Sequence, residues 1–186
     1  MSPNRSRLPC LQRIRKRLRY HRNALIGEGF FGGLARLGRL HPLSNPAKHG
    51  VQVIRDVEYL RGGNPRHRLD IYRPSHHRGT PLPIVMYIHG GGFNLLSKNT
   101  HWLMGLAFAR AGYLVFNIDY RLAPENPYPA AVSDICAALE WVSENAEAHG
   151  GDLSRLVFAG ESAGGNLATA LTICCCYRRL LYQLTG

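Results

Sequence analysis

The sequence of 186 residues contains no run of about eighteen consecutive apolar residues, the length that a helix needs to cross a bilayer. A membrane-spanning helix is therefore not expected. The chain starts with basic residues, but the apolar core of a signal peptide is also missing. Arginines and one lysine occupy its place: Arg13, Arg15, Lys16, Arg17 and Arg19. With no export signal, we expect the chain to be cytoplasmic.

Cysteine is scarce and is not spaced for a structural role. The chain has five, namely Cys10, Cys136 and the run Cys174, Cys175 and Cys176. Three adjacent cysteines have neither the spacing of a zinc site nor the even number of a disulfide framework. The sequence therefore predicts buried, reduced thiols. It implies no metal and no organic cofactor.

Acidic residues are nearly absent from the first 50 residues. Residues 1–50 hold 11 Lys and Arg against one acid, Glu28, whereas residues 51–186 hold 12 Lys and Arg against 11 acids. The basic charge thus belongs to an N-terminal segment, residues 1–50, and the main domain, residues 51–186, is nearly neutral. Nucleic-acid binding is disfavoured because the segment has no interleaved aromatic residues and no known motif.

The main domain alternates between strand and helix patterns. Val51–Leu60 and Arg66–Tyr72 are predicted to form a hairpin around a Gly-Gly-Asn-Pro turn. Buried strands and helices then follow in alternation: strand Ile84–Ile88, helix Thr100–Ala111, strand Tyr113–Ile118, helix Ala130–Ala148, strand Leu156–Ala159 and a helix from Ser162. This order predicts an α/β fold with a mostly parallel sheet and flanking helices.

A Gly-x-Ser-x-Gly motif, residues 160–164, stands between the last predicted strand and its helix. A nucleophile on a sharp strand-to-helix turn needs small neighbours, and Gly160 and Gly164 satisfy that need. The start of the helix adds a positive dipole near a developing anion. The pentapeptide alone also occurs by chance in loops, so Ser162 is a candidate nucleophile that needs a second signal.

The second signal is a run of three glycines after the strand Ile84–Ile88, in the segment His89-Gly90-Gly91-Gly92-Phe93. Such a run lets backbone N–H groups turn toward a carbonyl oxygen that gains negative charge during acyl transfer. A phosphate-binding loop would end in Lys followed by Ser or Thr, and this one does not. The two motifs end parallel strands, so we expect Ser162 to face the Gly91–Gly92 loop.

Three segments together resemble the hormone-sensitive-lipase group of α/β-hydrolase serine esterases. They are HGGGF at 89–93, DYRLAPE at 119–125 and GESAGGN at 160–166. The resemblance runs from about Val51 to about Thr172. It implies a small-molecule acyl ester as substrate, of short to medium acyl chain, and leaves a related amide or carbamate open. The oligomeric state is not indicated.

The resemblance also implies roles for individual residues. Ser162 would be the catalytic nucleophile, and the backbone N–H groups of Gly91, Gly92 and Ala163 would form the oxyanion hole. His89 would shape the glycine loop instead of acting as the base. Asp119 and Arg121 would brace the loop beneath the site. For Glu161, beside the nucleophile, the sequence leaves tuning, bracing and a solvent-facing position open.

For the basic segment, residues 1–50, the resemblance implies a helical cap over the pocket. Weak docking on an anionic membrane surface and a disordered tail are the alternatives. The pattern Leu8, Leu11, Ile14 and Leu18 predicts a short amphipathic helix. Because its apolar stripe is narrow, we expect that helix to pack in the cap instead of binding lipid strongly. The glycine-rich stretch 27–38, with Pro42 and Pro46 after it, is predicted as a linker.

The acid and the histidine of a catalytic triad follow the serine in this fold, but residues 163–186 contain no Asp, Glu or His. The histidines upstream, including His101 and His149, do not occupy positions that the family uses. The resemblance implies eight strands where five can be placed, so Leu156–Ala159 would expose an apolar edge. We therefore expect a partial α/β-hydrolase fold, the result of a gene fragment, a frameshift or an incomplete record. The chain would then be an impaired esterase or a non-catalytic remnant of one.

Overall fold

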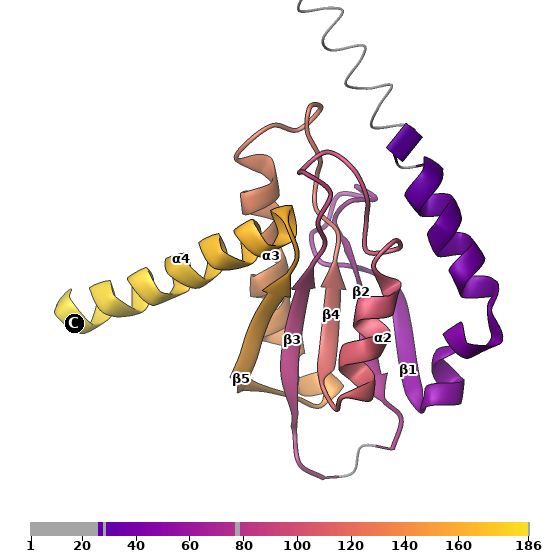
Figure 1. Ribbon diagram of the computed structural model, residues 1–186. Coiled ribbons are helices and arrows are strands. Elements are labelled where there is room, and N and C mark those ends of the chain that lie inside the picture. The colour runs from indigo at the N-terminus through magenta and orange to yellow at the C-terminus, as the bar shows by residue number, and fades with distance from the viewer. Residues whose placement is uncertain (1–25, 28, 77–78, 186) are drawn as a thin grey trace, which may run out of the picture.

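The computed structural model describes residues 26–27, 29–76 and 79–185. The predicted helix Leu8–Leu18 and Cys10 lie outside these residues. A single five-stranded sheet, in the order β1-β2-β4-β3-β5, forms the centre of the molecule (Figure 1). Its strands are β1 Val51–Glu58, β2 Arg68–Pro74, β3 Leu82–Ile88, β4 Leu114–Ile118 and β5 Gly151–Gly160.

Strand directions divide the sheet into a hairpin and a parallel part. β1 pairs antiparallel with β2, which confirms the predicted hairpin, and β2 pairs antiparallel with β4. β3 pairs parallel with β4 on one side and with β5 on the other. Parallel neighbours need a crossover connection, and the helices between these strands provide it. The predicted α/β fold with a mostly parallel core is confirmed.

Helices cover both faces of the sheet. On one face α3 (Ala130–Asn145) and α4 (Ala163–Thr185) pack over a cluster that includes Phe116 and Ile135. On the other face α2 (Trp102–Arg110) packs over a smaller cluster that includes Tyr72 and Val85. Strands buried on both faces explain the continuous apolar runs of β3 and β4.

The predicted elements differ from the observed ones mainly at their ends. The helix predicted to reach Ala148 is α3 followed by a short 3-10 turn, η3 (Glu147–His149), and Gly150 ends it in the left-handed conformation at φ +84°. β5 begins five residues before the predicted Leu156, at Gly151. Its first five residues include one glycine and three polar side chains, so their pattern did not indicate a strand.

The glycine-rich stretch was wrongly predicted as a linker, because residues 26–27 and 29–40 are helical. We call this element the N-terminal helix; two short 3-10 turns, η1 (Pro42–Ser44) and η2 (Pro46–His49), connect it to β1. Packing does not require its glycines: a Cβ on Gly38 would lie 3.6 Å from Trp102 and one on Gly27 would lie 3.6 Å from Leu95, both ordinary van der Waals contacts. The segment is thus helical despite the low helix propensity of glycine.

The prediction of buried thiols was also wrong. Cys136 and the run Cys174–Cys176 are exposed. The run lies on the part of α4 that projects beyond the sheet (Figure 1), where none of the described elements covers the helix. Within the residues that the structure describes, no helix is long and apolar enough to cross a membrane.

Candidate active site

Ser162 lies between the end of β5 and the start of α4, at the predicted strand-to-helix turn. Its φ of +53° is in the left-handed region, which costs a residue with a Cβ about 1–2 kcal/mol. The turn is tight because a Cβ on Gly164 would lie 2.0 Å from the carbonyl oxygen of Ile88, and one on Gly160 would lie 2.5 Å from that same oxygen. Both glycines are therefore required where the motif has them.

The glycine loop follows β3 directly and is also strained. Gly91 and Gly92 have φ of +113° and +60°, and Phe93 continues at +64°. A Cβ on Gly91 would lie 2.0 Å from the carbonyl oxygen of Leu95, so the loop closes tightly on itself. The N–H of Ala123, in the DYRLAPE segment, donates to the carbonyl of Phe93 at 2.8 Å and holds the loop from outside.

Glu161 joins the two motifs. Its Oε1 accepts a hydrogen bond from the N–H of Gly90 at 2.6 Å, and its Oε2 accepts one from the hydroxyl of Tyr87. The Nε2 of His101 lies 2.7 Å from Oε1. Burial, with the bond to Glu161 second, raises the pKa of Tyr87 well above its ordinary value, so the phenol remains a donor. The sequence left three roles open for Glu161, and these contacts support bracing.

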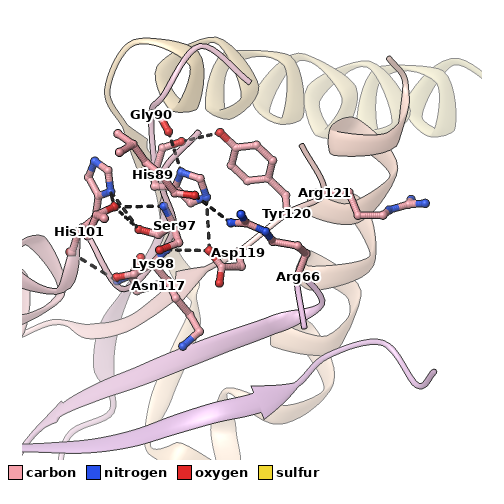
Figure 2. Close-up of polar contacts among 12 residues, drawn as sticks. Arg66, His89, Gly90, Ser97, Lys98, His101, Asn117, Asp119, Tyr120 and Arg121 are labelled. Carbon is pink, nitrogen blue, oxygen red and sulfur yellow. Dashed lines mark hydrogen bonds and ion pairs between the residues drawn. The ribbon is translucent and has the colours of Figure 1, made fainter. Parts of the chain in front are cut away.

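His89 is fully buried, and an oxygen lies near each ring nitrogen, although Nε2 makes no hydrogen bond with any described residue (Figure 2). Its Nδ1 lies 2.7 Å from the carbonyl oxygen of Gly90, which can only accept, so Nδ1 carries the proton. Its Nε2 lies 3.4 Å from Oδ1 of Asp119. The ring stacks on Tyr120 at 4.3 Å, and the hydroxyl of Tyr120 donates to the carbonyl of His89 at 2.8 Å. These contacts fit a residue that shapes the loop.

Asp119 and Arg121 brace different parts of the fold. Asp119 accepts from the backbone N–H of Lys98 at 2.7 Å and so holds the segment after the glycine loop, as expected. Arg121 does not brace that loop and points away from the cluster around His89 (Figure 2). It binds the buried carboxylate of Asp134 on α3 with two nitrogens, the shorter contact being 2.6 Å. The prediction for Arg121 was wrong because its partner, Asp134, lies 13 positions further along the chain on another element, and no local pattern indicates that contact.

Lys98 is a structural residue that no sequence pattern indicated. Its side chain is 2% exposed, and its Nζ lies 2.7 Å from Oδ1 of both Asp56 and Asp70. Asp56 stands at a β-bulge in β1 with φ of +57°, and its own N–H donates to Asp70 at 2.9 Å. The bond from Lys98 is the largest cause that lowers the pKa of Asp56. A lone lysine in a polar loop has no pattern that would indicate such burial.

Three backbone donors near the two motifs have no acceptor. The N–H groups of Gly91, Gly92 and Ala163 make no backbone hydrogen bond with any described residue. Ala163 is the first residue of α4 and is 5% exposed, so its N–H adds to the positive end of the helix. Such donors can bind an oxyanion.

An open cavity of about 430 Å³ lies between the N-terminal helix and the segment that follows the glycine loop. The N-terminal helix forms one wall with residues that include Ala35 and Arg39, and Leu96–Thr100 contribute to the opposite wall. Arg39 crosses between the walls: its Nη2 donates to the carbonyl of Asn99 at 3.0 Å, and its guanidinium lies 5.9 Å from the ring centre of Trp102.

Comparison with known proteins assigns the class that this fold and site define. A family described as having the alpha/beta hydrolase fold matches residues 85–183, which include the glycine loop and Ser162. The chain therefore belongs to the α/β-hydrolase fold family. The resemblance to the hormone-sensitive-lipase group of esterases is confirmed by the esterase relatives described next.

Among curated proteins, carboxylesterase NlhH of Mycobacterium tuberculosis is 52% identical over 91 residues, which cover 48% of this chain and 28% of NlhH. Carboxylic ester hydrolase LipN of the same organism is 42% identical over 129 residues, covering 67% of this chain and 34% of LipN. Among solved structures, esterase LipW from Mycobacterium marinum superposes with a TM-score of 0.66 at 38% identity, covering 80% of this chain and 45% of LipW. The matched part of the chain thus spans less than half the length of these relatives.

Proposed function

We propose that this chain is the part of a carboxylic-ester hydrolase that carries the nucleophilic serine and the oxyanion hole. The observation that carries the proposal is that the N–H groups of Gly91, Gly92 and Ala163 make no backbone hydrogen bond with any described residue and lie in two motifs that Glu161 ties together. Carboxylesterases among the relatives support the reaction class. The substrate class is a small acyl ester.

In this mechanism the hydroxyl of Ser162 attacks the acyl carbonyl and gives up its proton to a base. The carbonyl oxygen becomes an oxyanion, which the three N–H groups stabilise, and loss of one such donor costs about 3–4 kcal/mol. The tetrahedral intermediate expels the alcohol to leave an acyl-serine, which water then hydrolyses. Glu161 acts as a positioning residue because it fixes the N–H of Gly90 beside the loop.

The mechanism needs a base, and the 186-residue polypeptide offers no candidate for it at the family's position. Residues 163–186 contain no Asp, Glu or His. His101 already lies 2.7 Å from Glu161, and His89 is fully buried with its Nδ1 on the carbonyl of Gly90. We therefore expect this polypeptide by itself to hydrolyse p-nitrophenyl butyrate close to the uncatalysed rate. Triad-less serine hydrolases retain about 10³–10⁴-fold acceleration over water, which sets the upper limit.

The decisive experiment supplies the missing groups in a hybrid. The segment of NlhH that follows its matched region is fused after residue 183, where the family match ends. We expect the hybrid to hydrolyse p-nitrophenyl butyrate, and Ser162→Ala to reduce that rate by at least 1000-fold, in line with the loss of a triad member. Ser133→Ala, at an exposed serine on α3, is the matched control and should leave the rate unchanged. A folded hybrid whose activity survives Ser162→Ala would refute the assignment of Ser162.

A further inference from the structure

The N-terminal helix carries six large apolar side chains that point to solvent. They are 47–79% exposed: Ile26, Phe30, Phe31, Leu34, Leu37 and Leu40. At about 100° per residue, all but Phe31 fall within one stripe, and Phe31 borders it. We call these six residues the outward face.

The opposite side of the same helix contacts the body of the protein. Ala35 packs against the cluster under α2, and Arg39 donates to Asn99. Gly32 and Arg36 line the cavity together with these two residues. A surface helix of a globular protein normally turns its apolar stripe inward, and this one turns small and basic residues inward. Figure 1 shows the helix, in indigo, along the outside of the molecule with its outer side uncovered. The outward face is therefore unpartnered among the described residues.

The basic charge of the N-terminal segment indicates what kind of partner the outward face binds. Residues 1–50 hold 11 Lys and Arg against one acid. An apolar helical stripe in a strongly basic segment favours binding at the boundary of headgroups and acyl chains in an anionic bilayer, although Arg36 and Arg39 of the helix itself lie on the side toward the cavity. We infer that the outward face docks on an anionic lipid surface, with the basic residues of the segment attracting it there. This inference does not depend on the proposed function.

A second copy of the chain fits the same face less well. Pairing two outward faces would bring two strongly basic N-terminal segments together, and like charges repel. An anionic lipid surface instead neutralises the basic residues while it covers the apolar ones.

The test is co-sedimentation of the full 186-residue protein with vesicles. We expect binding to vesicles of phosphatidylcholine and phosphatidylglycerol (3:1) to exceed binding to phosphatidylcholine alone by at least ten-fold, and to weaken as salt is raised. The double variant Phe30→Ser/Leu37→Ser keeps every charge and should bind the anionic vesicles at least ten-fold more weakly. The matched control is Leu103→Ser/Ile173→Ser, which removes two equally exposed apolar side chains from α2 and α4 and should bind like the unaltered protein.

Circular dichroism of all three proteins verifies that they fold alike, which is expected because the four substituted side chains are exposed. Three results would overturn the inference. The first is no binding to anionic vesicles. The second is binding that the Phe30→Ser/Leu37→Ser variant retains, which would assign it to the basic residues alone. The third is a dimer in sedimentation velocity that this variant abolishes while vesicle binding stays absent, which would make the partner a second copy.

Discussion

Ser162 holds its hydroxyl at the end of β5 at the expense of backbone strain, with φ at +53°. The turn is confined on both sides, since a Cβ added to Gly160 or Gly164 would collide with the carbonyl oxygen of Ile88. Strain of this kind persists only where the surrounding structure imposes it, and it is common at active sites. The conformation of Ser162 is therefore a cost to stability.

We predict that Ser162→Gly is more stable than Ser162→Ala, by up to about 1 kcal/mol in the free energy of unfolding. Glycine removes a left-handed penalty of about 1–2 kcal/mol, and its greater freedom in the unfolded chain takes back about 0.5–1 kcal/mol. Urea denaturation measures the difference. At Ser133, inside α3, the order should reverse, because glycine in an ordinary helix is less stable than alanine. The same order at both positions would contradict the strain at Ser162.

Sequence was informative for residues whose role is local and silent for residues whose partners are distant. Ser162 with its two glycines, and the glycine loop, were located because a sharp turn requires those residue types within a few positions. Lys98 could not be selected, because it meets Asp56 and Asp70 across 42 and 28 positions of the chain. The contact of Glu161 with Gly90 spans 71 positions, so its bracing role had to come from the structure.

Between elements, a charged pair with several hydrogen bonds joins the segment after β4 to α3. Arg121 meets Asp134 with its Nε and Nη2, and the backbone N–H of Arg121 donates to the same carboxylate at 2.8 Å. The Asp134 side chain is 1% exposed and has His67 as a further neighbour, at 3.2 Å. The carboxylate therefore depends on Arg121 for most of its compensation.

We predict that Arg121→Met lowers the free energy of unfolding by about 2–3 kcal/mol. Breaking a fully buried pair costs about 3–5 kcal/mol. The value should be lower here because the Arg121 side chain is 28% exposed and His67 stays beside the carboxylate. Urea denaturation at pH 7 tests it. Arg155→Met, which removes the exposed partner of Asp152, should leave the urea midpoint nearly unchanged. Equal effects of the two substitutions would show that α3 does not depend on the Arg121–Asp134 pair.

Elements with a clear period were predicted well, and those without one were not. The hairpin, β3, β4, α2 and most of α3 carried apolar runs or helical spacing. The N-terminal helix was missed because five glycines between positions 27 and 38 outweighed the helical spacing of its apolar residues. Those residues face solvent, so the usual inference from periodicity to a buried face would also have failed.

At the scale of the whole molecule, one edge of the sheet is notable. β5 pairs with β3 on one side and lies at the end of the strand order among the described residues. It is ten residues long and contains no proline. Val157 in its centre is 50% exposed. The sequence predicted an apolar edge here, and the described strand order agrees with it.

We predict that Val157→Lys reduces self-association of the 186-residue protein. A long edge strand presents unpaired N–H and C=O groups to another chain, and a lysine on such a strand opposes pairing. Light scattering over a range of protein concentrations should show a smaller rise for Val157→Lys than for the unaltered protein. Ile173→Lys is the matched control, since it adds the same charge at an apolar side chain that is 62% exposed on α4, away from the edge. If Ile173→Lys suppressed association as strongly as Val157→Lys, net charge would be the cause and the edge of β5 would not. If only Val157→Lys acts, the association runs through the backbone of β5, the strand that leads directly into Ser162.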